Sequence, residues 1–408
     1  MFRKSTIIFA EPPLRLTFVQ YAGDYRDAFE RLERGGQETY HAQRYSVNVV
    51  GELAQRLEQV CFVCAVTETR YDTLLGNGVR AIGAGLRHGF KGADLVREVA
   101  KSKPTGLSLT TPNLSVLKWG HTNKIPTIAI LADSFQYGGL RSLVRNRLLA
   151  HYLNKSTVDW IGNHGINACL SLAKIGVRPQ KIVPWDWPHI RSPSYNTSKT
   201  LRQGPSWKIV YVGSVAPAKG VPDVLNALAL LKAIGIHVSL SIVGSEPDSA
   251  MRQLAETLDI LATTEFVGLV DNKHVPRLMR EADLVIIPSR HEYPEGLPLT
   301  IYEALSARTP IVASDHPMFR NVLVDQESAL IFPAGDAEKL AAAIERLLGD
   351  PELYARLSLG SEEAWNAIQL PVQMGNLLEA WLSNDRTRLD WLKAHTLNSG
   401  RYDNFIQR

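Results

Sequence analysis

The chain has 408 residues, more than one ordinary hydrophobic core holds, so we expect two domains. Its 45% hydrophobic and 21% charged residues exclude collagen-like, coiled-coil and largely disordered chains. The longest apolar runs are far shorter than the roughly 18 residues of a membrane-spanning helix, and the N-terminal apolar patch is too short for a secretory signal. We therefore expect a cytoplasmic protein.

The formal charge of +4 is unevenly distributed along the chain. Residues 1–200 carry a net charge of +11, and residues 201–408 carry −7. A basic half is typical of proteins with an anionic partner, such as nucleic acid, a phosphorylated lipid or an acidic membrane surface. The sequence contains no recognisable nucleic-acid-binding module, so we expect no nucleic-acid partner.

Short apolar runs alternate with helical patterns in chain order. Runs of this kind, separated by helices of about 10 to 20 residues, predict parallel sheets with right-handed crossovers and therefore an α/β fold. The expected strands are residues 16–21, 59–66, 127–131, 160–162, 208–212, 238–243, 265–267, 284–288 and 310–313.

The composition changes near the middle of the chain. Residues 184–205 are rich in Pro, Ser, Asn and Thr and precede a fresh strand, which predicts an interdomain linker. We therefore expect an N-terminal domain over residues 1–190 and a C-terminal domain over residues 205–370. The tail, residues 371–408, has the pattern of a helix that is apolar on one face.

Cys61 and Cys64 form a C-x-x-C pattern inside the strand expected at residues 59–66. Positions three apart on a strand point to opposite faces, which disfavours a zinc or redox site and favours buried core cysteines. The third cysteine, Cys169, completes no disulfide framework.

A glycine-bearing loop follows the strand expected at residues 208–212. Gly213 to Gly220 separates this strand from an amphipathic helix expected at residues 222–231, the order found in many phosphate-binding sites. Lys219 would be the cation. The loop matches neither G-x-G-x-x-G nor the Walker A pattern, so a plain tight turn is the alternative.

Two acids follow the strand expected at residues 284–288. Glu295 is expected in the loop after a parallel strand, where open α/β sheets bind ligands, and Glu303 two turns along the next helix. The backbone amides of Leu299 and Thr300, at the start of this helix, can bind an anion. A solvated helix face is the alternative for the two acids.

These motifs together resemble the retaining glycosyltransferases of family four, which have the GT-B fold of two facing Rossmann-like domains. The resemblance covers the second half of the chain closely and the first half thinly. In this fold the last helix crosses back onto the N-terminal domain, which we expect of residues 371–408. The matching segments are GGQET at 35–39, compared with the loop after the first strand, YVGSVAPAKG at 211–220, EGLPLTIYEA at 295–304, PIVASD at 310–315 and ALIFPAGDAEKLAAAI at 329–344.

The resemblance implies a nucleotide-sugar donor that is bound mainly by the C-terminal domain. Glu295 would bind hydroxyls of the transferred sugar and Glu303 the two ribose hydroxyls, because a carboxylate accepts two charge-assisted hydrogen bonds from a diol. Lys219 would neutralise the departing diphosphate without a metal ion or other cofactor. The other donor-binding residues that the resemblance implies are Gly213, Ser214, Val270, Arg290, Gly296, Leu297, Leu299 and Thr300.

The chain departs from the family pattern at two positions. Ser214 stands where the family usually has Arg, and Arg290 is the candidate replacement for that cation. Asp133 follows a strand at a place where a histidine is usual, so Asp133 becomes the catalytic-site candidate from the first domain.

The acceptor side offers weaker candidates. Gly35 and Gly36 would let the backbone approach a ligand closely, and Glu38 follows them. His121 and His164 are expected to be structural.

Residues 140–155 have a basic amphipathic pattern. Arg141, Arg145, Arg147 and Lys155 alternate with leucines at helical spacing. An ordinary surface helix is the favoured interpretation, and contact with anionic lipid at the inner face of the plasma membrane is the alternative.

The resemblance predicts a retaining glycosyltransferase of polysaccharide or glycoconjugate biosynthesis. It would move a hexose, glucose from UDP-glucose, to a saccharide or a lipid-linked saccharide. Uridine is favoured by the family and by the backbone of residues 267–270, which we expect to contact a pyrimidine edge. A nucleotide-sugar isomerase or a non-catalytic protein of the same fold is the alternative, and a nicotinamide oxidoreductase is disfavoured because its glycine fingerprint is missing.

Overall fold

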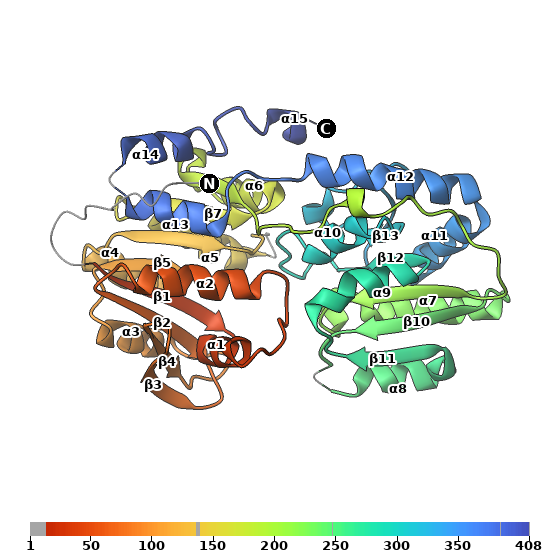
Figure 1. Ribbon diagram of the computed structural model, residues 1–408, viewed down its shortest axis with the longest axis horizontal. Coiled ribbons are helices and arrows are strands. Elements are labelled where there is room, and N and C mark those ends of the chain that lie inside the picture. The colour runs from red at the N-terminus through yellow and green to blue at the C-terminus, as the bar shows by residue number, and fades with distance from the viewer. Residues whose placement is uncertain (1–13, 136–138, 247, 384, 408) are drawn as a thin grey trace. The chain divides into compact units, whose positions relative to one another are not determined.

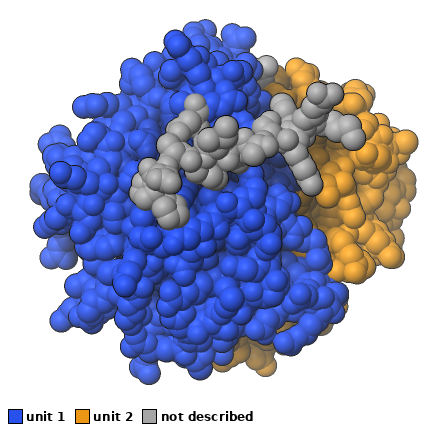
Figure 2. All heavy atoms as spheres, turned by 60° about the vertical axis from the view of Figure 1, so that its left-hand side comes forward, with its two compact units in different colours: residues 1–37, 42–188, 370–407 blue, residues 38–41, 189–369, 408 orange. Residues whose placement is uncertain are grey.

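The structure is a computed structural model that describes residues 14–135, 139–246, 248–383 and 385–407. The chain divides into two compact units, coloured blue and orange in Figure 2. The first unit comprises residues 1–37, 42–188 and 370–407, and the second comprises residues 38–41, 189–369 and 408. The boundaries expected at residues 190 and 370 fall next to these divisions.

The first unit is built on an eight-stranded sheet in the order β3-β4-β2-β1-β5-β6-β7-β8. All neighbouring strands are parallel except β3 and β4 at one edge. The strands are β1 (Arg15–Ala22), β2 (Gln59–Val66), β3 (Arg70–Leu74), β4 (Val79–Ala84), β5 (Gly106–Leu109), β6 (Thr127–Leu131), β7 (Val158–His164) and β8 (Ile182–Trp185).

Helices cover both faces of this sheet (Figure 1). Helices α3, α4 and α5 pack beside one another, and α1, α2 and α13 form another group. The helices of this unit are α1 (Tyr25–Glu33), α2 (Gln43–Ala54), α3 (Gly92–Lys101), α4 (Leu114–Thr122), α5 (Leu140–Leu153), α6 (Ile166–Lys174), α13 (Met374–Leu382), α14 (Arg386–Lys393) and α15 (Asp403–Ile406), with the short 3-10 helix η1 (Pro179–Lys181).

The antiparallel edge corrects the expectation of a wholly parallel sheet. Residues 70–74 alternate between exposed and half-buried, so this strand has no apolar run for a sequence pattern to detect. Gly78, with a φ of 83°, closes the turn between β3 and β4, where the amide of Leu75 donates to the carbonyl of Val79 at 2.9 Å. Strands β4, β5, β8 and β14 were also not anticipated.

The tail returns to the first unit as three helices rather than one. Leu377 and Leu378 of α13 are fully buried in the core that α1, α2 and the sheet form. The amide of Asp186 donates to the carbonyl of Val372 at 2.9 Å, which attaches the tail next to β8. The tail therefore supplies part of the first unit's core.

The second unit is built on a six-stranded sheet in the order β11-β10-β9-β12-β13-β14, and every neighbouring pair is parallel. Helices α7, α8 and α11 pack together, as do α9, α10 and α12. The strands are β9 (Trp207–Val212), β10 (Val238–Val243), β11 (Thr264–Gly268), β12 (Leu284–Ile287), β13 (Ile311–Ser314) and β14 (Ala329–Phe332). The α-helices are α7 (Val221–Ala233), α8 (Ala250–Thr257), α9 (Val275–Glu281), α10 (Leu299–Ser306), α11 (Ala337–Gly349) and α12 (Pro351–Ala367).

Most of the expected linker is part of folded units. Residues 182–185 form strand β8, and the chain from residue 189 onward belongs to the second unit. Lys199 is held there because its Nζ donates to the carbonyls of Arg280, at 3.0 Å, and Ala282. Burial, together with the charge of the nearby Arg280, lowers the pKa of Lys199 to about 8. The C-terminal domain thus begins before residue 205.

Cys61, Cys64 and Cys169 are free and buried, as expected. Burial raises the pKa of Cys61 to about 11 and that of Cys64 to about 12, which disfavours the thiolate needed for redox or zinc chemistry. Within the described ranges, no helix is both long and apolar enough to cross a membrane.

Candidate functional site

The sequence-predicted donor residues lie in the second unit, mostly near the carboxyl ends of its strands. Strand β9 lies between β10 and β12, so the order of the strands reverses on its two sides. Ligands of open α/β sheets bind outside the carboxyl ends at such a reversal. Gly213 follows β9, and Ser289 and Glu295 follow β12, at that position.

Two glycines allow a close approach where β9 and β10 end. Gly213 has a φ of 151°, and its amide donates to the carbonyl of Val243 at 2.9 Å. A Cβ atom on Gly244 would lie 1.8 Å from the carbonyl oxygen of Gly213. Only glycine fits at residue 244, a position that the sequence analysis missed.

Gly220 brings the first loop against the loop that follows β12. Its φ is 76°, and a Cβ atom there would lie 2.0 Å from the carbonyl oxygen of Pro288. The amide of Arg290 also donates to the carbonyl of Ala218 at 3.0 Å. The short 3-10 helix η3 (Pro217–Lys219) therefore presents Lys219 to the loop that carries Glu295.

Lys219 and Glu295 form a buried ion pair. The Nζ atom of Lys219 lies 2.5 Å from Oε1 of Glu295, and the two side chains are 16% and 7% exposed. The hydroxyl of Ser289 donates to the same oxygen at 2.6 Å. Among the described residues no donor reaches Oε2 of Glu295, so this oxygen can accept a hydrogen bond from a ligand.

The backbone of Tyr293 connects several of these groups. Its carbonyl accepts the amide of Glu295 at 2.8 Å and lies 3.1 Å from Nε2 of His316. Nδ1 of His316 accepts the amide of Met318 at 3.2 Å, so Nε2 carries the proton and donates. Lys219 Nζ lies 4.0 Å from the centre of the Tyr293 ring.

His316 and Ser289 are site residues that the sequence reasoning missed. Neither has a motif of its own, although His316 directly follows the matching segment 310–315 and Ser289 directly follows the strand expected at residues 284–288. Burial lowers the pKa of His316, which favours the neutral ring that this hydrogen-bond pattern needs.

Arg290 is paired with an acid, as Lys219 is. Its Nε and a terminal nitrogen donate to the two carboxylate oxygens of Asp223 at 2.9 and 2.6 Å. This bidentate hydrogen bonding raises the pKa of Arg290. Asp223 offsets part of this positive charge, and a phosphate contact of Arg290 stays a prediction.

Glu303 is buried, and no cation among the described residues is in hydrogen-bond contact with it. Its Oε1 accepts the side-chain amide of Asn272 at 2.7 Å, and its side chain points from α10, where the residue is 8% exposed. Burial raises the pKa of Glu303 to about 7, although the Asn272 hydrogen bond and the charge of Arg191 act in the opposite direction. Asn272 has no motif and was not anticipated.

The start of α10 has the expected free donors. The N-cap residue is Pro298, and no side chain caps this helix. Gly296, Leu299 and Thr300 are half-exposed, so a ligand can reach this segment, whereas Leu297 is buried. The amides of the first turn can bind an anion here.

Ser214 and Val270 complete the expected donor set. Ser214 is exposed, and its carbonyl accepts the hydroxyl of Tyr211 at 2.7 Å. Val270 is half-exposed in the loop that follows β11 and stands two residues before Asn272.

Most of the remaining candidates belong to the first unit. Asp133 follows β6, its carbonyl accepts the side-chain amide of Asn163 at 2.9 Å, and burial raises its pKa. His164 lies 2.8 Å from Oδ1 of the buried Asp186. His121 contacts the Thr157 hydroxyl at 3.2 Å. The contacts of both histidines fit structural roles.

The structure corrects the expected position of Gly35 and Gly36. They follow helix α1, not the first strand. The amides of Gly35 and Gly36 donate to the carbonyls of Leu32, at 3.2 Å, and Arg31, at 2.8 Å, which is a Schellman motif. Gly35 has the positive φ, 77°, that this motif needs, so helix termination accounts for both glycines.

Glu38 is assigned to the second unit rather than to the expected N-terminal domain. Its carbonyl accepts the amide of Asn272 at 3.3 Å. The physical reason is that Glu38 follows the turn that ends α1 and makes its backbone contact with the loop after β11. This contact does not assign Glu38 to an acceptor site.

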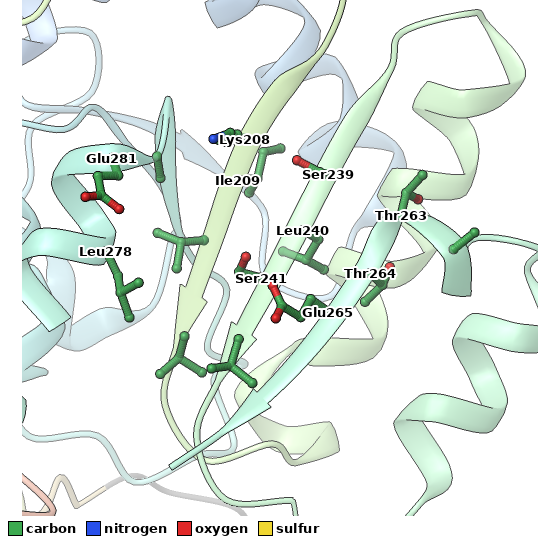
Figure 3. A pocket seen from close by; sticks show the side chains of 15 residues that line it. Lys208, Ile209, Ser239, Leu240, Ser241, Thr263, Thr264, Glu265, Leu278 and Glu281 are labelled. Atoms are coloured by element: carbon green, nitrogen blue, oxygen red, sulfur yellow. The ribbon is translucent and has the colours of Figure 1, made fainter. Parts of the chain in front are cut away.

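A separate cavity of about 470 Å³ lies on one face of the same sheet (Figure 3). Ser241 and Glu265 occupy paired positions on β10 and β11, and Leu278 and Glu281 of α9 form another wall. The cavity runs along the strands, and of the residues expected to contact the donor only Val267, the first residue of the segment 267–270, lines it. Its lining provides no cluster of cations for a diphosphate, so we place the functional site at the strand ends.

The cluster at the strand ends combines three kinds of group. Lys219 supplies a cation, the start of α10 supplies amide donors, and Glu295 and Glu303 each offer a carboxylate oxygen. Such a set can bind an anion next to a polyhydroxylated group. Within the part of the chain that the structure describes, no group of three or more His, Cys, Asp or Glu residues could hold a metal ion.

Sequence comparison identifies relatives of this second unit. The family model of glycosyl transferases group 1 matches residues 196–363. The α-D-kanosaminyltransferase of Streptomyces kanamyceticus is 30% identical over 173 residues, 42% of either chain. The phosphatidyl-myo-inositol mannosyltransferase of Mycolicibacterium smegmatis is 35% identical over 139 residues, 34% of this chain and 35% of the relative. The match thus spans less than half of the length of these relatives.

Solved structures resemble a larger part of the chain. The Anabaena protein HepE in complex with UDP has a TM-score of 0.62 at 16% identity, over 87% of this chain and 95% of that one. The sucrose-phosphate synthase of Thermosynechococcus elongatus has a TM-score of 0.62 at 17% identity, over 87% and 94%. At these identities the likeness establishes the fold. The chain therefore has the GT-B fold, and its residues 196–363 match the family of glycosyl transferases group 1.

Proposed function

We propose that the protein is a glycosyltransferase that uses a nucleotide sugar as its donor. The observation that carries this proposal is the buried Lys219–Glu295 pair beside the uncapped start of α10. It combines a cation for a diphosphate with a carboxylate for sugar hydroxyls. The family match and the named transferases among the relatives support it.

We further propose that the donor is a uridine-diphosphate sugar, with UDP-glucose as first choice. Solved structures of similar fold contain UDP or UDP-glucose, and a glycogen synthase of Mycobacterium tuberculosis is 30% identical over 205 residues. Glu303 would accept the ribose hydroxyls, and the loop that ends at Val270 would contact the base. The acceptor would be a saccharide or a lipid-linked saccharide.

The proposed chemistry uses groups of this chain alone. Negative charge develops on the diphosphate as the glycosidic bond breaks, and Lys219 with the first-turn amides of α10 stabilises it without a metal ion. Glu295 orients the sugar through its hydroxyls. We propose retention of configuration from the family resemblance, with the acceptor attacking from the face that the leaving group vacates.

The test is a panel of nucleotide sugars offered to the protein with and without saccharide acceptors. Release of free nucleotide, with UDP-glucose giving the fastest release, would support the proposal. Conversion of the donor without nucleotide release would indicate an isomerase instead. A preference for GDP sugars would contradict the uridine assignment. The anomeric configuration of the product, measured by NMR, tests retention.

A matched pair of variants tests whether the activity measured with the nucleotide sugars depends on this site. Glu295→Ala removes the carboxylate that faces the sugar, whereas Glu292→Ala removes an exposed acid of the same loop. Loss of nucleotide release in the first variant alone would assign the activity to the cluster. Equal activity of the two variants would show that the site lies elsewhere.

A further inference from the structure

Helix α5 of the first unit (Figure 1) exposes an apolar stripe. Leu140, Val144 and Leu148 are 80%, 55% and 45% exposed. Their spacing of four residues places them within about 80° of arc on one helix face. The opposite side of α5, with Asn146, Leu149, Ala150 and Leu153, is the buried side. The exposed stripe is therefore separate from the face of α5 that packs on the rest of the first unit.

Arginines border this stripe on both sides. At about 100° per residue, Arg147 lies at one edge of the stripe, and Arg141 and Arg145 lie at the other. All three arginines are exposed, and none of them forms an ion pair with a described residue. Helix α5 contains no acidic residue. Their charges are therefore not neutralised within the described parts of the chain.

The surrounding sequence has the same charge bias. Between residues 99 and 158 there are eight Lys and Arg residues, and Asp133 is the only acid. Lys118 and Lys124, on and just after the neighbouring helix α4, are exposed. The positive potential around α5 thus extends beyond the helix itself.

We propose that α5 docks the protein on the surface of an anionic phospholipid membrane. The apolar stripe would enter the boundary between headgroups and acyl chains, and the flanking arginines would contact the phosphates. This reverses the favoured interpretation of the sequence, because the pattern did not show that three large apolar side chains face outward. The proposal rests on α5 and is independent of the proposed transferase activity.

Two other occupants fit the surface less well. Nucleic acid would satisfy the arginines but would leave the apolar stripe without an apolar partner. A second copy of the chain, docked face to face, would bring two sets of three unpaired arginines together. Three exposed apolar side chains also provide too little area for a stable dimer, which needs on the order of 1,000 Å².

Vesicle flotation of the full chain tests the proposal. We expect binding to vesicles of phosphatidylcholine mixed with phosphatidylglycerol, no binding to phosphatidylcholine alone, and weaker binding at high salt. The triple variant Arg141→Gln, Arg145→Gln, Arg147→Gln should lower the partition coefficient on the order of 100-fold, from about 1 kcal/mol per arginine. The variant Leu140→Ser, Val144→Ser, Leu148→Ser should lower it by about tenfold or more.

Matched controls remove similar side chains elsewhere. Leu74→Ser, Ile234→Ser, Leu359→Ser removes three exposed apolar side chains, and Arg34→Gln, Arg277→Gln, Arg386→Gln removes three exposed arginines. Both controls should bind vesicles like the unmodified chain. All the substituted side chains are exposed, so circular dichroism should show native folding throughout.

Several outcomes would overturn the proposal. The unmodified chain would fail to bind anionic vesicles, or the control variants would lose as much vesicle binding as the α5 variants. Binding to a homopolymeric RNA without vesicle binding would assign the surface to nucleic acid. A dimer in light scattering that the Leu140, Val144, Leu148 variant abolishes, again without vesicle binding, would assign it to a second copy.

Discussion

The carboxylates of Glu295, in a loop, and of Glu303, on helix α10, are buried to a similar extent. They differ in the partners that surround their charge. The two residues are 6% and 8% exposed. Glu295 faces the ammonium of Lys219 and a hydroxyl, whereas Glu303 has one neutral amide, from Asn272. Burial accordingly raises the pKa of Glu303 to about 7. Burial alone does not determine what a carboxylate can do, because the partner decides whether its charge persists.

The largest effect is expected from Lys219→Ala. This change leaves Glu295 buried with Ser289 as its one side-chain donor, and an uncompensated buried charge costs about 3 to 5 kcal/mol of stability. Turnover should fall about 100-fold or more, because the cation that stabilises the leaving group is lost. Urea unfolding and kcat measure the two effects.

The control for this change is Lys232→Ala, which removes an exposed lysine paired with the exposed Asp259. Its effect on stability should stay within about 1 kcal/mol. The double variant Lys219→Ala, Glu295→Ala should recover part of the stability lost in the single one. A Lys219→Ala protein with normal stability would show that the pair is not energetically coupled.

Glu295→Ala should impair the reaction of the sugar while leaving the binding of the nucleotide nearly unchanged. We expect sugar transfer and donor hydrolysis to fall about 100-fold, since the carboxylate no longer orients the sugar. Affinity for free UDP should change less than about twofold, because UDP has no transferred sugar. Calorimetry with UDP and with UDP-glucose makes the comparison, and equal losses for both ligands would contradict the assignment.

Glu303→Gln should have opposite effects on the empty and the ligand-bound protein. The pKa of Glu303 is about 7 in the folded chain against a reference of 4.5, so its ionisation weakens the fold progressively between these pH values. At pH 8 the variant should be more stable by about 3 kcal/mol, and at pH 4 equally stable. Urea unfolding at both pH values checks the sign.

The same variant should weaken UDP binding at pH 8 by about 1 to 3 kcal/mol, because a neutral amide replaces a charged acceptor for the ribose hydroxyls. In the unmodified protein, UDP affinity should therefore rise as the pH increases through about 7. Calorimetry over this range measures both effects. A pH-independent affinity would mean that Glu303 does not bind the ribose.

Asn272→Ala should give the smallest effect. Removing the amide takes away a hydrogen bond that stabilises the charged form, so the pKa of Glu303 should rise and the midpoint of the UDP pH profile should move upward. The cost in UDP affinity at pH 8 should be about 1 kcal/mol. Asn226→Ala, which removes an amide bound to the carbonyl of Pro222, is the control that should leave the profile unchanged.

The sequence predicted those strands and site residues that a local pattern of residues specifies. Strand β2 has a continuous apolar run, β10 alternates apolar residues with serines, and the segment from Glu295 to Glu303 has a fixed spacing, so all three were predictable. The Lys219–Glu295 contact joins positions 76 residues apart, and no local pattern specifies it. Asn272 and Gly244 were missed because their roles depend on what lies opposite them in space.

The first unit illustrates a different limit of sequence reasoning. The pair Gly35–Gly36 looked like a ligand loop, yet the same two residues are what the end of a helix needs. Helix α5 looked like an ordinary amphipathic helix because a pattern counts apolar residues and does not show which of them the fold leaves exposed. The structure corrects the first interpretation, whereas the second changes only with our proposal for α5.

The return of the tail to the first unit has a consequence for the order in which the protein is made. Val372, Leu377 and Leu378 belong to the core of the first unit. All strands of that unit are translated before residue 186. On the ribosome, the first unit must therefore wait, with an incomplete core, while the whole second unit emerges and folds. A released chain that ends at residue 369 should show a protease-resistant second unit and a protease-sensitive first one.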